Sequence, residues 1–311
     1  MITMTQRNIE FAIIGAAKSA STWLHLALRQ HPSIYMPGTE SAFFEDPFYD
    51  PEDLSPLRTI AAEAPSDTRI GIKCPNYLCS PECAPRLARH LPEIRMIAIL
   101  RNPIDRAISQ YYHLIRSGRL PVAPAETAFQ AYLRGEFDPR FAKKLILDFG
   151  GYGAGVQAYR QHFPSDRLLI LTDLELSVDR QEVFRRACRF LGVSDDFMPA
   201  TIALPRNQGV YFTPILSAIQ RLNSIGFTFD PQLGTERIRP GVVPSLARRL
   251  AVSTSRASAL LRHFVHDQEP EVSAEVRAKL LEYYRSDVNL LEALTGLDLQ
   301  QWTQLPLPIR D

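Results

Sequence analysis

Residues 15–23 (GAAKSASTW) bring together the kinds of side chain that bind anions. A glycine and three alanines leave room for backbone N–H groups to approach an anion, while Lys18 adds a positive charge and three hydroxyls add donors. A helical pattern follows directly, and the start of a helix contributes roughly half a positive charge. We interpret the segment as a phosphate-binding loop, with a small-residue turn and a solvated lysine as the alternative. It is not a Walker A motif, which ends in GK followed by S or T.

A second anion-binding pattern occupies residues 100–112 (LRNPIDRAISQYY). Arg101 follows an apolar strand pattern, and Asn102 and Pro103 are typical of the first positions of a helix. Ser109 follows two helical turns later. An arginine can hold a phosphate by two parallel hydrogen bonds, and Ser109 can donate a third. The alternative is a surface arginine followed by an ordinary helical serine.

The elements that position these side chains alternate along the chain. Short apolar runs indicate buried parallel strands, and the segments between them have helical periodicity. The predicted strands cover residues 9–14, 69–73, 94–100 and 168–172. The predicted helices cover residues 21–30, 81–90, 104–116, 155–163, 180–191 and 273–294. This alternation predicts an α/β fold, a P-loop-like three-layer α/β/α arrangement around a central, mostly parallel sheet.

Two regions are less regular in the sequence. Residues 38–67 combine many carboxylates with prolines and aromatic residues, which indicates an irregular segment pinned by aromatic rings. Residues 206–270 are broken up by prolines and glycines, and we expect no strand there. Residues 245–266 are the exception, a potential helix with four arginines and no acidic residue. That helix is either a solvated basic face over an apolar stripe or a docking surface for an anionic acceptor or a membrane.

Composition narrows the class of protein. The chain has 311 residues, of which 45% are hydrophobic and 22% charged, and its formal net charge is +1. This profile is typical of a soluble globular protein, and it gives no global field that would select a nucleic acid. No apolar run approaches the roughly 18–20 residues that span a bilayer, and the N-terminus lacks the pattern of a secretory signal. We expect a cytoplasmic location. The spacing of Cys74, Cys79 and Cys83 fits no common zinc pattern, so no metal site is predicted.

Taken together, these segments resemble the sulfotransferases that use 3′-phosphoadenosine 5′-phosphosulfate (PAPS). Residues 15–23 resemble the 5′-phosphosulfate loop of that family, often PKSGTTWL, and residues 100–112 resemble its 3′-phosphate motif, RNPxxRAxSxY. Residues 38–44 (GTESAFF) and 71–77 (GIKCPNY) resemble the KExHFF and EKxPxY segments of the heparan-sulfate-type and related bacterial branch. The resemblance extends to residues 169–174, 189–192 and 272–302. Two positions depart from the pattern, because Ala20 replaces a glycine and Ala42 replaces a histidine.

The resemblance implies how the donor is bound. Lys18 would neutralise charge on the departing 5′-phosphate, and Arg101 with Ser109 would hold the 3′-phosphate. The latter pair would let the enzyme choose PAPS over ATP, which has no 3′-phosphate. Residues 206–211 (RNQGVY) match the adenine-side loop loosely. The remaining predicted donor contacts are Ser19, Ala20, Ser21, Thr22, Trp23, Arg206 and Gly209.

The resemblance also implies which residues catalyse the transfer and which contact the acceptor. Glu40 would be the general base, and Lys73 would lie near the acceptor and the transferring group, so the predicted catalytic set is Glu40, Lys18 and Lys73. For Glu40 the alternative is one more solvated acid in an acidic segment. Lysine and backbone dipoles would replace the magnesium of kinases, so no metal is required. The predicted acceptor contacts are Phe43, Phe44, Lys73 and Tyr77.

Residues 1–311 are accordingly predicted to form one sulfotransferase domain, with residues 206–270 as an irregular segment that covers acceptor or cofactor. The expected product from the donor is adenosine 3′,5′-bisphosphate (PAP). The acceptor is open between a small molecule, a lipid and a saccharide, and the oligomeric state is not predicted. Two other functions stay open. One is an inactive nucleotide-binding relative, favoured by Ala20 and Ala42, and the other is a P-loop kinase, disfavoured by the missing GK[ST] ending.

Overall fold

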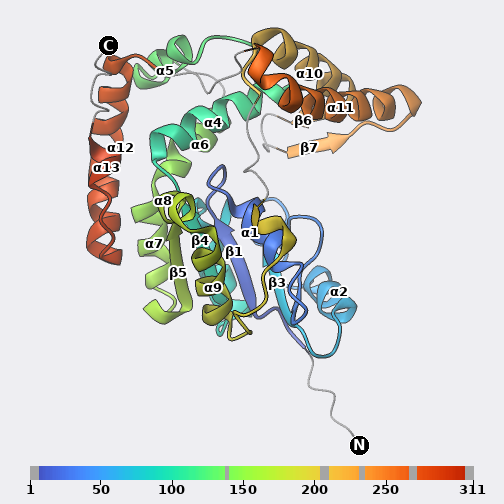
Figure 1. Ribbon diagram of the computed structural model, residues 1–311, viewed down its shortest axis with the longest axis vertical. Helices are drawn as coiled ribbons and strands as arrows, with labels where there is room; N and C mark the ends of the chain where they lie inside the picture. The colour runs from blue at the N-terminus through green and yellow to red at the C-terminus, as the bar shows by residue number, and fades with distance from the viewer. Residues whose placement is uncertain (1–6, 137–139, 204–209, 231–234, 266–271, 305–311) are drawn as a thin grey trace, which may run out of the picture. The chain divides into compact units, whose positions relative to one another are not determined.

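The computed structural model describes residues 7–136, 140–203, 210–230, 235–265 and 272–304. The chain divides into two compact units, each assembled from segments that are distant in sequence (Figure 1). Unit 1 contains Met1–Arg101, Gly151–Asn207 and Asp287–Asp298, and unit 2 contains Asn102–Gly150, Gln208–Ser286 and Leu299–Asp311. The prediction of one domain over residues 1–311 stays a prediction.

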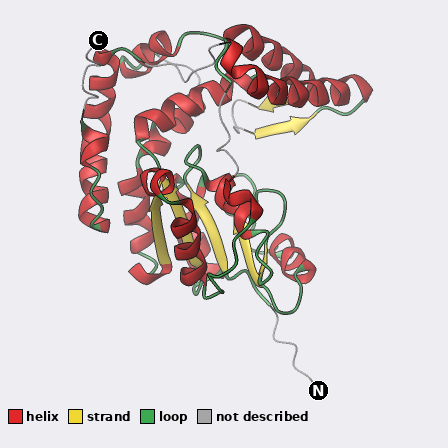
Figure 2. Cartoon of the chain, in the orientation of Figure 1, coloured by secondary structure: helices red, strands yellow, loops and turns green. Residues whose placement is uncertain are grey.

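Unit 1 is built on a five-stranded sheet in the order β2-β3-β1-β4-β5, and every pair in it is parallel (Figure 2). The strands are β1 (Phe11–Gly15), β2 (Ile34–Tyr35), β3 (Arg69–Lys73), β4 (Arg95–Leu100) and β5 (Leu168–Thr172). The four predicted strands are confirmed, and so is the three-layer α/β fold. The two-residue β2 was not predicted, because so short a run carries no periodicity.

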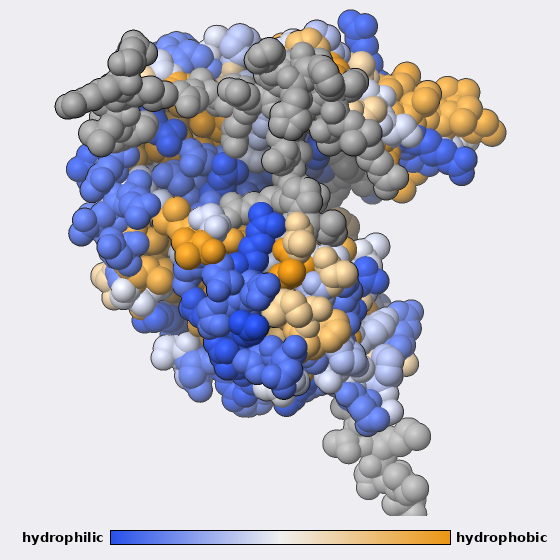
Figure 3. Space-filling model, in the orientation of Figure 1, coloured by the Kyte–Doolittle hydropathy of each residue, from blue (hydrophilic) through white to orange (hydrophobic). Residues whose placement is uncertain are grey.

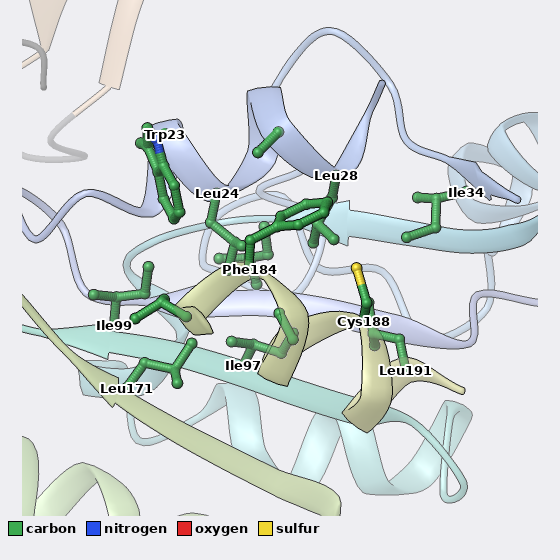
Figure 4. Close-up of a cluster of buried hydrophobic side chains, with 14 of the residues drawn as sticks. Trp23, Leu24, Leu28, Ile34, Ile97, Ile99, Leu171, Phe184, Cys188 and Leu191 are labelled. Atoms are coloured by element: carbon green, nitrogen blue, oxygen red, sulfur yellow. The ribbon is translucent and has the colours of Figure 1, made fainter. Parts of the chain in front are cut away.

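Helices cover both faces of this sheet, which explains why the central residues of its longer strands are apolar. The helices of unit 1 are α1 (Ser21–Leu28), α2 (Ser55–Glu63), α3 (Cys83–His90), α7 (Tyr152–Arg160), α8 (Asp173–Val178) and α9 (Arg180–Leu191). On one face, side chains of α1 and α9 such as Leu24 and Phe184 pack against Ile97 and Leu171 of the strands (Figure 4). On the other face, α3 and α7 pack around the short 3₁₀ helix η1 (Tyr77–Cys79).

Unit 2 is mainly helical. Its helices are α4 (Pro103–Arg116), α5 (Ala125–Leu133), α6 (Arg140–Ile146), α10 (Thr213–Gly226), α11 (Val242–Val265), most of α12 (Ala274–Thr295), and α13 (Gln300–Thr303). The Asn102 side chain accepts a hydrogen bond of 2.9 Å from the Ile104 amide, and Pro103 is the first residue of α4. The predicted start of this helix is therefore confirmed.

The prediction of irregular structure over residues 206–270 was wrong for much of that segment, whereas the potential helix over residues 245–266 is confirmed by α11. Helices α10 and α11 pack against each other, and the antiparallel strands β6 (Phe227–Asp230) and β7 (Thr235–Ile238) connect them. Pro214 lies in the first turn of α10, and Gly241 adopts a φ of +117° just before α11. The prolines and glycines thus mark the ends of elements rather than interrupt them. No helix among the described residues is long and apolar enough to cross a membrane.

Candidate active site

Functional side chains of unit 1 gather at the carboxyl ends of its parallel strands. The loop of residues 16–20 follows β1, Lys73 is the last residue of β3, Arg101 follows β4, and Asp173 follows β5. Because β3, β1, β4 and β5 are neighbours in the sheet, these ends lie along one edge. Ligands of open α/β sheets bind outside this edge.

The loop after β1 has an unusual backbone. Lys18 and Ala20 both adopt left-handed conformations, with φ of 69° and 71°. A left-handed conformation costs an L-residue roughly 1–2 kcal/mol, because its Cβ approaches the following carbonyl. At Ala20 the chain therefore accepts strain that a glycine would avoid, which makes the departure from the family pattern visible in the structure.

The loop leads into α1 with polar groups that fit an anion. No side chain caps α1 at Ala20. The Ser19 side chain is 1% exposed, and its hydroxyl has no hydrogen-bond partner among the described residues. An unpaired buried hydroxyl costs roughly 1–3 kcal/mol. A phosphate oxygen bound at this helix start would satisfy both the hydroxyl and the backbone amides, so the residues present fit a phosphorylated donor.

Lys73 connects the loop region to the candidate base. Its side chain is 3% exposed, and its ammonium donates to Thr22 Oγ1 at 2.8 Å and to Glu40 Oε1 at 2.7 Å. A buried ammonium requires such partners. Glu40 itself is 53% exposed on its side chain, so solvent and ligands reach it. The structure thus brings together three residues that the sequence analysis selected from three separate segments.

Two residues that the sequence analysis missed hold the Glu40 segment, His25 in α1 and Arg29 directly after it. His25 Nε2 lies 2.9 Å from the Pro37 carbonyl oxygen, and Arg29 Nε donates to the Met36 carbonyl at 3.2 Å. Burial lowers the pKa of His25 to about 4, so this ring is neutral at neutral pH. Since a carbonyl only accepts, Nε2 carries the proton. The available signal was helical spacing, because His25 lies one turn after Thr22.

The aromatic residues near Glu40 are part of the core. Phe44 is fully buried, and its amide donates to the Tyr77 hydroxyl at 3.2 Å. The same hydroxyl donates to the Ser41 carbonyl, and Phe43 packs edge-on against Phe44 at 5.0 Å between ring centroids. These contacts position the segment that carries Glu40. Direct contact of Phe43, Phe44 or Tyr77 with an acceptor stays a prediction.

The remaining predicted donor contacts are distributed more widely. Arg101 Nε lies 3.9 Å from Asp173 Oδ2 in unit 1, an acid the sequence analysis missed although it directly follows a predicted strand. Ser109 lies in α4 of unit 2, so a joint role of Arg101 and Ser109 stays a prediction. The Trp23 indole packs in the core cluster (Figure 4), so donor contact by Trp23 stays a prediction. Arg206 and Gly209 lie outside the described residues.

A parallel sheet with a loop before α1 whose groups fit an anion is typical of nucleotide-binding α/β proteins. Comparison with known proteins narrows this class, because the sulfotransferase domain family matches residues 9–200. The chain belongs to that family of PAPS-dependent sulfotransferases, which confirms the resemblance drawn from its motifs.

Relatives and solved structures agree with this assignment. The chain is 30% identical over 201 residues to the human bifunctional heparan sulfate N-deacetylase/N-sulfotransferase 3. The aligned region covers 59% of this chain and 22% of that protein. It is 27% identical over 186 residues to the mouse heparan sulfate glucosamine 3-O-sulfotransferase 3B1, covering 58% of this chain and 45% of that protein. The crystal structure of a sulfotransferase from Alicyclobacillus acidocaldarius shares the fold, with a TM-score of 0.65 and 23% identity over 96% of this chain and all of that one.

Proposed function

We propose that this chain transfers the sulfuryl group of PAPS to a hydroxyl or amine of a small-molecule, lipid or saccharide acceptor. The observation that carries the proposal is the buried Lys73, which bridges Thr22 beside the donor loop and the exposed carboxylate of Glu40. Membership of the sulfotransferase family supports PAPS as donor. Because the proposed donor contacts come from both units, we also propose that residues 1–311 act as one domain. We propose a cytoplasmic location as well.

In this proposal the loop after β1 holds the 5′-phosphate. Lys18, the hydroxyls of Ser19, Ser21 and Thr22, and the first amides of α1 surround its oxygens, and the unpaired hydroxyl of Ser19 supports this assignment. Arg101 and Ser109 hold the 3′-phosphate, an assignment that depends on the sequence motif. Arg206 and Gly209 contact the adenine side on the same grounds.

The transfer step places Glu40 as the general base. The acceptor oxygen or nitrogen forms a bond to sulfur while the bond from sulfur to the 5′-phosphate oxygen breaks. Glu40 takes the acceptor proton, and PAP leaves with the electron pair and an added negative charge. Lys18 and Lys73 stabilise that charge, as positioned cations do in phosphoryl transfer.

The test uses radiolabelled PAPS and a panel of acceptors. Saccharides come first, because the relatives are named for heparan sulfate. The substitution Glu40→Gln should keep PAP binding and lower transfer by about 100- to 10,000-fold. Glu10→Gln, at the other end of the sheet, is the matched control and should transfer at the native rate. Native transfer by the Glu40→Gln variant would show that the base is another group.

A second experiment addresses the 3′-phosphate. Arg101→Ala should weaken PAP binding far more than ATP binding, because only PAP carries the 3′-phosphate. Equal weakening of the two nucleotides would remove that role from Arg101. If the native chain binds PAP tightly and sulfates no acceptor on the panel, the chain is an inactive, nucleotide-binding relative of the family. Ala20 and Ala42 are the two departures from the family pattern that favour this outcome.

A further inference from the structure

Helix α11 of unit 2 exposes large hydrophobic side chains. Val242 is 76% exposed and Val243 is 68% exposed. Half of the large hydrophobic residues that are exposed among the described residues lie between positions 238 and 252. They are Ile238, Val242, Val243, Leu246, Leu250 and Val252. A cluster of exposed apolar side chains more often marks an interaction surface than an ordinary solvent-exposed face.

The helical spacing places four of these residues on one side of α11, namely Val242, Val243, Leu246 and Leu250. Val242, Leu246 and Leu250 follow one another at intervals of four, so they form a continuous ridge. The small residues Ala247 and Ala251 are buried instead, and Ala251 belongs to the cluster that α10 contributes to through Ile219. The usual amphipathic arrangement is thus reversed, with small residues inside and large apolar residues in solvent. Figure 3 shows hydrophobic side chains gathered over α10 and α11.

Positive charge accompanies the apolar ridge. Arg249 of α11 is exposed, and so are Arg237 and Arg239 at the end of the hairpin that precedes this helix. From Arg237 to His266 the sequence has six arginines and no aspartate or glutamate, whereas the whole chain carries a net charge of only +1. The surface is therefore complementary to a partner that is both apolar and negatively charged. We call these exposed residues of 237–252 the basic apolar face.

The framework behind this face is fixed by hydrogen bonds. The Arg248 guanidinium donates to the Gly226 carbonyl at 3.1 Å and to the Arg239 carbonyl at 3.0 Å, and it lies over the Phe227 ring. Arg239 Nε donates to Thr228 Oγ1 at 3.0 Å. These contacts fasten the β6–β7 hairpin to the start of α11, so the side chains are presented together.

We propose that the basic apolar face binds the surface of a membrane that contains anionic lipid. Arginines beside a membrane gain from the negative surface potential, and valine and leucine side chains enter the boundary between headgroups and acyl chains. An anionic polysaccharide would use the arginines but leave the ridge in water. A second copy of this chain would cover the ridge but bring like charges together. The lipid surface satisfies both features.

The experiment is vesicle sedimentation with the full chain, using phosphatidylcholine alone and phosphatidylcholine mixed with phosphatidylserine. We expect binding to the mixed vesicles only. Leu246→Ser with Leu250→Ser should weaken it at least tenfold, because two leucines no longer leave water. Substitution of Arg237, Arg239 and Arg249 by glutamine should weaken vesicle binding about fivefold per arginine. Added salt should also weaken vesicle binding, because it screens the charges. No donor or acceptor is present, so the result is independent of the proposed sulfuryl transfer.

Matched controls come from unit 1. Val178→Ser changes a residue that is 87% exposed elsewhere, and the triple variant Arg58→Gln, Arg89→Gln, Arg160→Gln removes three exposed arginines elsewhere. Both should bind vesicles as the native chain does. Absence of binding to mixed vesicles overturns the proposal, and so does equal weakening by the controls. Binding of the chain to heparin beads but not to vesicles would also overturn the proposal. The same holds if the chain forms a dimer in solution that dissociates when Leu246 and Leu250 are replaced by serine.

Discussion

The two ends of the parallel sheet in unit 1 both carry cations, yet they differ in what those cations contact. At the amino end, two hollows of about 460 Å³ each include arginines among their lining residues. Arg69 pairs with Glu10 and Arg167 pairs with Glu93, while Arg95 donates to the Phe190 carbonyl. Arg7 donates to the carbonyls of residues 64, 65 and 68. These arginines are occupied by the fold itself.

At the carboxyl end, the polar groups are only partly satisfied by the protein. Ser19 has a buried hydroxyl without a partner among the described residues, and Lys73 is buried against a carboxylate that is half exposed. Buried polar groups lacking partners are costly, so they are kept where a ligand completes them. The comparison teaches that hydrogen-bond satisfaction, rather than the size of a hollow, separates the candidate site from a structural edge.

The largest difference expected between the two ends of the sheet concerns Lys73 and Arg69, the last and first residues of β3. Lys73→Met should lower sulfuryl transfer by about 100- to 1,000-fold, because the charge that stabilises the transition state is removed. Arg69→Met removes a cation from the other end of β3. It should leave transfer unchanged and lower the free energy of unfolding by about 0–1 kcal/mol. Rates with labelled PAPS and urea unfolding curves check both. Equal loss of activity in the two variants would erase the difference between the ends.

The second effect concerns stability in acid. The pKa of His25 is lowered from 6.5 to about 4, so the unfolded chain takes up this proton at a higher pH than the folded chain. The contribution of neutral His25 to the free energy of unfolding is complete above pH 6.5, and it is lost as the pH falls toward 4. The free energy of unfolding should fall by about 3 kcal/mol over that window on account of this group. His25→Gln keeps a donor for Pro37 and should remove that part of the slope. An unchanged slope would contradict the buried neutral ring.

The third effect compares two buried serines, Ser19 and Ser80. Among the described residues, only the Ser80 hydroxyl has a hydrogen-bond partner. Ser19→Ala should weaken PAP binding by about 10- to 100-fold, because a hydrogen bond to a charged oxygen is lost. The same change should keep or raise the stability of the ligand-free chain. Ser80, 2% exposed, donates to Glu45 at 3.5 Å, so Ser80→Ala should lower stability and leave PAP binding unchanged. Calorimetric titration and thermal unfolding measure the pair. Identical behaviour of the two variants would contradict a ligand role for Ser19.

The smallest effect is backbone relief at Ala20. Ala20→Gly should raise the free energy of unfolding by up to about 1 kcal/mol, because glycine adopts a φ of 71° without a Cβ clash. Ala64, at the amino end, has an extended backbone with φ of −75°. Ala64→Gly should therefore lower stability by about 0.5–1 kcal/mol through the entropy of the unfolded chain. Urea unfolding checks both signs, and a loss in both variants would argue against strain at Ala20.

The sequence by itself determined the local elements and the residue types of the candidate site. Apolar runs and helix-start residues are local signals, so the strands at 69–73 and 168–172 and the start at Asn102 were predictable. The patterns of residues 15–23 and 100–112 identified Lys18 and Arg101 as candidates, and the resemblance of short motifs to the sulfotransferase family added Glu40 and Lys73. Helix α10 was missed, since prolines and glycines at element ends look like interruptions when packing is unknown, whereas the potential helix over residues 245–266 corresponds to α11.

Tertiary structure alone decided which of these groups meet. The contact of Lys73 with both Thr22 and Glu40 joins residues 51 and 33 positions apart, and no local pattern encodes it. His25 and Asp173 gained their roles in the same way, through the packing of α1 on the Glu40 segment and of β5 beside β4. Burial also moved Phe44 and Tyr77 into the core. The physical reason is that hydrogen-bond partners and burial depend on contacts made across the sheet, whereas propensity and periodicity depend on neighbours in the chain.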